Sequence, residues 1–194
     1  MFLKNLKNYK IILASGSPRR QYLLKGLGID FIVETNREIE EVYPDTFTKE
    51  QIPVFLAELK ANKFNYEIND NIIVITADTI VWCDNQVLNK PVDYDNAVQI
   101  LNKLSGNKHQ VITGVCLKSK LKTVTFFSLT NVYFKNLTHQ EITYYIEKYK
   151  PYDKAGAYGI QEWIGYIGIE RIDGSYFNVM GLPVQKLYVE LAKF

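Results

Sequence analysis

Two arginines lie in the first turn of an expected helix near the start of the chain. The apolar, strand-like run 11–13 is followed by Ser17, Pro18, Arg19 and Arg20. Serine is a favoured N-cap and proline suits the first helical position, so we expect a helix to begin here. Arginine at this end opposes the helix dipole, and a bound phosphate would remove the conflict by accepting from the free N–H groups and both guanidinium groups. A solvated basic turn is the alternative.

Carboxylates that could hold a cation lie in two places. Asp78 interrupts an apolar strand pattern, and Glu38, Glu40 and Glu41 form an acidic group upstream. A carboxylate in an apolar run is costly unless it is paired, bound to a metal or placed where the strand meets a cleft. Asp78 and one of the glutamates therefore form a candidate site for Mg²⁺ or Mn²⁺. The alternatives are a core aspartate satisfied by backbone N–H groups and a solvated acidic loop; zinc is not indicated, because the two histidines lie far apart and the cysteines have no ligand motif.

Two lysines extend the possible anion site. Lys60 lies on a helix pattern whose neighbours are apolar, and Lys90 directly precedes a proline in a loop. A single lysine is usually solvated, but together with Arg19 and Arg20 these two could bind one polyphosphate while the carboxylates hold the metal. The sequence therefore favours phosphate chemistry at this set of residues.

The segment 153–161 combines small residues with an amide side chain. Glycine and alanine let the backbone approach a ligand closely, and Gln161 can pair with the edge of a base. A simple turn followed by a strand is the alternative.

Alternating strand and helix patterns must position these residues. Apolar runs predict strands, and helix periodicity with N-cap and C-cap signals predicts helices. The expected strands are 11–13, 71–83, 87–88, 110–117 and 123–134, and the expected helices begin at Ser17, after Pro91, at Thr138 and at Pro183. The stretch 158–176 is expected to form strands and turns. These elements favour an α/β fold with a mixed sheet, with α+β left open, and residues 1–194 are expected to form a single domain.

Composition limits the class of function. The chain has 194 residues, 47% hydrophobic and 23% charged, which allows an ordinary buried core. With 23 basic and 21 acidic residues, the net charge of +2 is too small to indicate a nucleic-acid or membrane surface. Cys83 and Cys116 are expected to be buried and reduced. The lysine-interrupted start predicts neither a signal peptide nor a membrane span, so a cytoplasmic location is expected.

Several motifs, in order along nearly the whole chain, resemble the Maf family of nucleoside triphosphate pyrophosphatases. They share glycine, proline, serine and charged residues at matching spacing. They are Leu13-Ala14-Ser15-Gly16-Ser17-Pro18-Arg19-Arg20, Ala77-Asp78-Thr79, Asn89-Lys90-Pro91, Leu104-Ser105-Gly106, the segment 153–161, Gly174-Ser175-Tyr176 and Gly181-Leu182-Pro183. The resemblance implies the inosine-triphosphatase-like fold, an elongated mixed sheet flanked by helices with a deep cleft between two lobes.

The resemblance also implies an activity and a set of roles. The family hydrolyses the bond between the α- and β-phosphates with a divalent cation, Mg²⁺ or Mn²⁺, and releases a monophosphate and pyrophosphate. Asp78 matches the catalytic aspartate, and Glu41, with Glu40 as second choice, matches the acidic loop residue that helps to hold the metal. The residues that match substrate-binding and specificity positions are Ser15, Ser17, Arg19, Arg20, Lys60, Thr79, Lys90 and Gln161. Arg19, Thr79 and Gln161 together are similar to the branch that prefers dTTP and UTP over 7-methyl-GTP.

One departure and two other functions remain open. Lys150 stands where the family commonly has a glutamate before the proline. A non-catalytic nucleotide sensor that arrests a partner would fit the family's association with septum formation, but it would make Asp78 and Glu41 dispensable. A nucleic-acid-binding module is a third reading of the aromatic and lysine residues in 144–152, although their helical spacing favours core packing. The expected partner is the nucleotide, without nucleic acid or membrane, and a homodimer is left open.

Overall fold

The computed structural model describes residues 3–35, 40–64 and 71–194. The strands are β1 (Lys10–Leu13), β2 (Ile32–Val33), β3 (Ile72–Cys83), β4 (Gln86–Leu88), β5 (Lys108–Lys118), β6 (Thr123–Phe134) and β7 (Ile169–Asp173). The α-helices are α1 (Pro18–Gly26), α2 (Gln51–Asn62), α3 (Tyr94–Leu104), α4 (His139–Tyr149), α5 (Trp163–Gly168), α6 (Tyr176–Val179) and α7 (Val184–Ala192). Short 3-10 turns η1 (Lys4–Leu6) and η2 (Ala155–Ala157) complete the described elements.

The strands form one mixed sheet of seven strands in the order β2-β1-β3-β5-β6-β7, with β4 paired to β3. β1 is parallel to both β2 and β3, whereas the β3–β4 and β6–β7 pairs are antiparallel. The expected α/β class with a mixed sheet flanked by helices is confirmed. The lobes and cleft implied by the family resemblance stay a prediction.

Two compact units divide the chain. Unit 1 comprises Met1–Asp78, Thr113–Ser128 and Gly181–Phe194, and unit 2 comprises Thr79–Ile112 and Leu129–Met180. Three long strands, β3, β5 and β6, each contribute residues to both units. A single domain over residues 1–194 stays a prediction.

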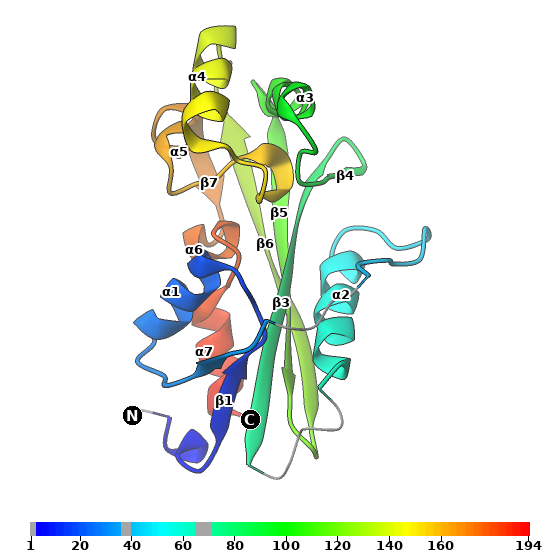
Figure 1. The fold of residues 1–194 in the computed structure, drawn as a ribbon, viewed down its shortest axis with the longest axis vertical. Helices are drawn as coiled ribbons and strands as arrows, with labels where there is room; N and C mark the ends of the chain where they lie inside the picture. The colour runs from blue at the N-terminus through cyan, green and yellow to red at the C-terminus, as the bar shows by residue number, and fades with distance from the viewer. Residues whose placement is uncertain (1–2, 36–39, 65–70) are drawn as a thin grey trace. The chain divides into compact units, whose positions relative to one another are not determined.

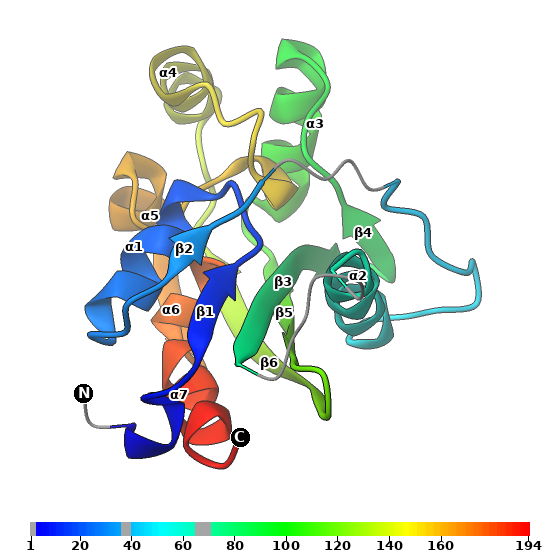
Figure 2. The same ribbon diagram turned by 60° about the horizontal axis from the view of Figure 1, so that its bottom comes forward.

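In unit 1, helices lie on both sides of the strands. α1 and α7 lie on one side of β1 and β3, and α2 lies on the other (Figures 1 and 2). α2 lies so close to β5 that a Cβ at Gly114 would collide with the backbone of Pro53. Ala57, Ala61 and Cys116 form a buried cluster of small side chains at the same contact. Small residues therefore decide how near the sheet α2 can lie.

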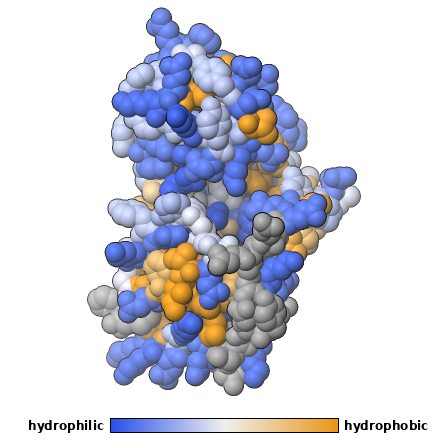
Figure 3. Space-filling model, viewed as in Figure 1, coloured by the Kyte–Doolittle hydropathy of each residue, from blue (hydrophilic) through white to orange (hydrophobic). Residues whose placement is uncertain are grey.

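The surface seen in Figure 3 is mainly hydrophilic, with hydrophobic side chains gathered near β1 and β2 of unit 1. Ile32 and Val33, which make up β2, are 46% and 37% exposed. Elsewhere the apolar residues of β1 are buried, as are Ile73, Val74 and Ile75 of β3. Among the described residues, no helix combines the length and hydrophobicity needed to cross a bilayer.

In unit 2, the last part of β3 pairs with β4, and β7 pairs with β6. α3 begins at Asp93, whose side chain accepts from the N–H of Asn96 at 2.8 Å. α4 begins at the predicted Thr138 with a capping box, in which Thr138 and Glu141 satisfy each other's backbone N–H groups. α4 ends at Lys150, an exposed residue with a left-handed backbone (φ 46°).

The sequence expectations for the elements are confirmed except at one stretch. Ser17 is the N-cap of α1, and Cys83 and Cys116 are buried and free. The expectation of strands and turns at 158–176 is wrong in part, because Trp163–Gly168 forms α5 before the short strand β7. The helix was not predicted because glycine has low helix propensity. Gly165 lies in its first turn, where its N–H donates to the Glu162 carbonyl at 2.9 Å.

Candidate active site

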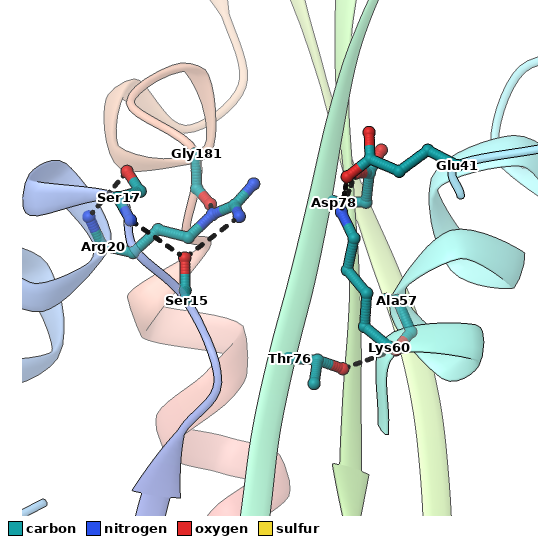
Figure 4. Close-up of polar contacts among 9 residues, drawn as sticks. All are labelled: Ser15, Ser17, Arg20, Glu41, Ala57, Lys60, Thr76, Asp78 and Gly181. Carbon is teal, nitrogen blue, oxygen red and sulfur yellow. Dashed lines mark hydrogen bonds and ion pairs between the residues drawn. The ribbon is translucent and has the colours of Figure 1, made fainter. Parts of the chain in front are cut away.

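Arg20 is held at the start of α1 by hydrogen bonds from both its side chain and its backbone. Its Nε donates to the Gly181 carbonyl at 2.9 Å, its Nη1 donates to Ser15 Oγ at 3.4 Å, and its backbone N–H donates to Ser17 Oγ at 3.5 Å (Figure 4). Ser15 Oγ also accepts from the N–H of Ser17 at 3.3 Å. The predicted anion-binding turn is thus built as a ring of hydrogen bonds. The sequence shows Gly181 only as part of a motif and gives no signal that its carbonyl accepts from Arg20.

A second group, which we call the carboxylate–lysine cluster, consists of Glu41, Lys60 and Asp78. Lys60 Nζ lies 2.5 Å from Asp78 Oδ1 and 2.7 Å from Glu41 Oε1 (Figure 4). The side chains of Asp78 and Lys60 are only 9% and 15% exposed, whereas that of Glu41 is 48% exposed. The buried aspartate is therefore satisfied by an ammonium group, and the sequence alternative of backbone N–H partners does not describe its main contact.

Secondary structure places these side chains together. Residues two apart on a strand share a face, so Thr76 and Asp78 point to the same side of β3. On α2, Ala57 and Lys60 are separated by about one turn and share a face. The Thr76 hydroxyl donates to the Ala57 carbonyl at 2.5 Å, and Lys60 of the same helix pairs with Asp78 of the same strand (Figure 4). The hydrogen bond from Thr76 to Ala57 and the ion pair between Lys60 and Asp78 both join α2 to β3.

The electrostatics connect the helix start to the cluster within unit 1. Burial lowers the pKa of the Arg20 guanidinium, and the positive charge of Arg19 lowers it further, while Asp78 and Glu41 oppose this change. Arginine keeps its charge in proteins, so Arg20 contributes a fixed cation here. The Arg20 guanidinium therefore interacts electrostatically with both carboxylates of the cluster.

The pair of carboxylates fits a hard divalent cation. Mg²⁺ is commonly bound by one or two carboxylates, with waters and substrate phosphates as its other ligands. Glu41 and Asp78 provide such a pair of oxygens, and both already face a cation, Lys60. Among the residues that the structure describes, no group of three or more His, Cys, Asp or Glu side chains could hold a metal.

The remaining candidates take separate places. Arg19 lies half-buried in the first turn of α1, and Glu40 is exposed, while Glu38 lies outside the described residues. Thr79, Lys90 and Gln161 belong to unit 2, where Thr79 is half-buried in β3 and Lys90 is exposed. Their approach to the phosphate-binding residues stays a prediction.

Gln161 carries a buried amide oxygen. Within the part of the chain that the structure describes, its Oε1 has no hydrogen-bond partner. An unpaired buried acceptor costs about 1–3 kcal/mol, and an N–H donor on a ligand would remove that cost. The unpaired oxygen is a physical reason to expect that Gln161 pairs with a ligand group.

A polar network next to Gln161 was not foreseen. The Tyr145 hydroxyl donates to Glu162 Oε2 in a short hydrogen bond and accepts from the N–H of Gly159 at 3.0 Å. Glu162 Oε1 lies 3.1 Å from Nζ of Lys154, which also contacts Asp153 at 2.7 Å. The helical spacing in 144–152 favoured core packing, and a buried tyrosine such as Tyr145 needs a partner for its hydroxyl. The partner could not be assigned, because it lies 17 residues away on another element.

Comparison with known proteins places the chain in a family. The family model described as "Maf-like protein" matches residues 10–194. The chain belongs to this Maf-like family. A protein of Phocaeicola vulgatus named dTTP/UTP pyrophosphatase is 57% identical over 98% of this chain and 99% of its own length. A protein of the same name from Parabacteroides distasonis is 55% identical over 99% of this chain and 100% of its own length.

Similarity to solved structures is weaker. A nucleoside-triphosphatase/dITP/XTP pyrophosphatase from Mycobacterium abscessus covers 93% of both chains with 15% identity and a TM-score of 0.41. This degree of likeness supports no conclusion about fold or function. The family membership rests on the near full-length relatives and on the family match.

Lys150, which stands where Maf-like proteins commonly have a glutamate, lies at the end of α4. Lys150 is the C-cap of α4, and its N–H donates to the Ile146 carbonyl at 2.9 Å. Its side chain is exposed. The lysine therefore ends a helix through its backbone, a role that does not need a carboxylate.

Proposed function

We propose that this Maf-like protein is an enzyme that hydrolyses nucleoside triphosphates, with dTTP and UTP preferred, to the monophosphate and pyrophosphate. The observation that carries the proposal is the carboxylate–lysine cluster, in which Glu41 and Asp78 meet at Lys60. Such a cluster can hold a cation and a phosphate oxygen at once. The near full-length relatives named dTTP/UTP pyrophosphatase support the same reaction.

In this mechanism, unit 1 handles the phosphates. Arg20, held by Ser15 and Gly181, and Lys60 would neutralise charge on the phosphate oxygens, and Arg19 at the helix start would add to them. Glu41 and Asp78 would hold the divalent metal, Mg²⁺ or Mn²⁺, which when bound supplies Lewis-acid charge stabilisation. Asp78 would also accept the proton of the attacking water as its oxygen bonds to the α-phosphorus. The bond from the α-phosphorus to the bridging oxygen breaks, and pyrophosphate leaves.

Unit 2 would read the base. The buried Oε1 of Gln161 can accept from the N3–H of uracil or thymine, and its amide N–H can donate to an adjacent carbonyl. Cytosine presents a different pattern, and a purine needs a wider slot. Thr79 and Lys90 are proposed as further substrate contacts.

The remaining parts of the proposal concern location and partners. The buried free thiols Cys83 and Cys116 are consistent with a reducing compartment, so we place the enzyme in the cytoplasm. The nucleotide is the proposed partner, without nucleic acid. Oligomeric state, with a homodimer as one arrangement, is left to measurement.

A pyrophosphate-release screen tests this function. UTP, dTTP, CTP, GTP and 7-methyl-GTP are each assayed with Mg²⁺ and with Mn²⁺, and then with EDTA. We expect dTTP and UTP to give the highest kcat/KM, EDTA to abolish turnover, and added metal to restore it. Tight nucleotide binding without turnover would favour the nucleotide sensor, full activity in EDTA would reject the metal, and a preference for a guanine nucleotide would reject the pyrimidine assignment.

A further inference from the structure

Gly159 lies directly beneath two side chains that follow it. A Cβ at this position would lie 2.9 Å from Gln161 Nε2, 2.9 Å from Glu162 Cδ and 3.0 Å from Glu162 Oε2. Gly159 does not have the positive φ of the neighbouring Gly156 (φ 71°). A side chain here would therefore displace the ends of the Gln161 and Glu162 side chains, which fold back over the backbone in the space that glycine leaves.

The carboxylate of Glu162 is held in place on both oxygens. Oε2 accepts from Tyr145, whose hydroxyl in turn accepts from the N–H of Gly159, and Oε1 pairs with Lys154 at 3.1 Å. Burial and the nearby Glu162 raise the pKa of Tyr145, so its hydroxyl stays protonated and donates. The side chains of Lys154 and Glu162 are only 9% and 18% exposed. A satisfied network of this kind is rigid.

The backbone on either side of the amide is also fixed. The N–H of Glu162 donates to the Gly159 carbonyl at 3.0 Å, and the Tyr166 hydroxyl donates to the Gln161 carbonyl at 2.9 Å. The main chain of Gln161 is therefore held from two sides, while its amide oxygen faces no protein donor among the described residues. The position of the Gln161 amide therefore depends on its fixed main chain and on the neighbouring Gly159 and Glu162.

From these contacts we propose that Gly159, Tyr145 and Glu162 are positioning residues that set the place of the Gln161 amide and, through it, the enzyme's selectivity among pyrimidines. We call them the amide support. The proposal rests on the proposed function, because it assumes that Gln161 reads the base. Uracil and cytosine differ in donors and acceptors on one edge, so a small displacement of the reading amide reduces discrimination between them.

The test compares alanine substitutions at two glycines of unit 2. Gly159→Ala places a methyl group against the Gln161 amide, whereas Gly168→Ala meets only Leu137 Cδ2 at 3.1 Å and Ile164 Cγ1 at 3.7 Å. The readout is the ratio of kcat/KM for UTP to that for CTP, which a general loss of stability does not change. We expect Gly159→Ala to lower this ratio by about 10-fold to 10²-fold, as expected for a misplaced group, and Gly168→Ala to keep it.

Gly159→Ala is also combined with Gln161→Ala. If the glycine acts through the amide, the double variant has the same UTP/CTP ratio as Gln161→Ala alone. An unchanged ratio in Gly159→Ala beside a lowered ratio in Gln161→Ala overturns the amide support and leaves the base assignment standing. An unchanged ratio in Gln161→Ala overturns both. A further loss in the double variant also overturns the support through Gln161.

A second pair of variants keeps the test decisive if Gly159→Ala does not fold. Tyr145→Phe removes the hydroxyl that joins Gly159 to Glu162, whereas Tyr158→Phe removes a buried hydroxyl whose partner is His109 at 2.8 Å. We expect both variants to have a lower melting temperature, because each loses a buried hydrogen bond, but only Tyr145→Phe to have a lower UTP/CTP ratio. Equal ratios in the two variants would show that the Tyr145 hydroxyl serves stability alone.

Discussion

Each unit of the molecule contains a lysine between two carboxylates, but the two groups are built differently. In unit 1, Lys60 contacts Glu41 and Asp78, and Glu41 is 48% exposed. In unit 2, Lys154 contacts Asp153 and Glu162, and Glu162 is tied through Tyr145 to a backbone N–H. The first group can exchange partners when a cation and phosphates arrive. The second is a fixed support, because moving it would leave several buried polar groups without partners.

The difference shows how similar charges serve different purposes. Chemistry on a triphosphate needs groups that change partners during the reaction. Exposure does not separate the two groups, because Asp153 is 60% exposed and Glu41 48%. The difference is the pair of hydrogen bonds that joins Glu162 through Tyr145 to the N–H of Gly159. Recognition of a base edge needs an amide held in one place, and a buried, satisfied network provides it. The following variants test whether the two groups are separable in this way.

The largest effect is expected at the exchangeable group. Asp78→Asn removes the proposed proton acceptor while keeping its shape, so we expect kcat to fall by about 10²-fold to 10⁴-fold, the usual range for a general base. The UTP/CTP ratio of the residual activity should stay unchanged, because the amide support is intact. Asp30→Asn, at an exposed position of the same unit, is the matched control. Near-normal turnover of folded Asp78→Asn would exclude this aspartate from the reaction.

A smaller effect is expected at the arginine that joins the helix start to Gly181. Arg20→Lys keeps the charge but cannot donate to both Ser15 and Gly181 from one planar group. Loss of a charged hydrogen bond costs about 1.5–3 kcal/mol, so binding of triphosphate should weaken roughly 10-fold to 10²-fold. Binding of the monophosphate, measured by calorimetry, should change much less. Equal losses for both nucleotides would mean that Arg20 supports the fold or contacts the nucleoside.

The smallest effect concerns stability in unit 2, at the buried His109. Burial lowers the pKa of His109 to about 3. The unfolded chain therefore binds a proton below about pH 6.5 that the folded chain does not, and stability falls as pH decreases from 6.5 toward 3. From pH 7 to pH 5 this group should contribute a loss of about 2 kcal/mol in the free energy of unfolding.

His109→Gln should remove this part of the pH dependence in urea unfolding measured at pH 7 and pH 5. His139→Gln, at the exposed start of α4, is the matched control and should keep the wild-type pH dependence. The turnover of His109→Gln at pH 7 should retain the wild-type UTP/CTP ratio. An identical pH dependence in wild type and His109→Gln would show that this histidine is not the group that titrates on unfolding.

Much of the fold could be predicted from local signals. Ser17 as N-cap of α1 and the capping box of α4 depend on residues three positions apart, and β3 contains a long apolar run that predicts a buried strand. The helix α5 was not predicted, because its glycines lower intrinsic helix propensity and packing overrides it. Local propensity and capping predict a helix or strand only where tertiary packing does not override them.

For the site, the sequence by itself determined which residue types are available and which family they resemble. It provided Arg19 and Arg20 at a helix start, Asp78 in an apolar strand, and Gln161 after a run of small residues. Tertiary structure decided which of them meet. Asp78 faces Lys60 because β3 and α2 are fixed in register by Thr76 and Ala57, and Gln161 lies over Gly159 because Glu162 is held by Tyr145. These pairings join groups on separate elements, and only packing of the folded chain fixes their distances.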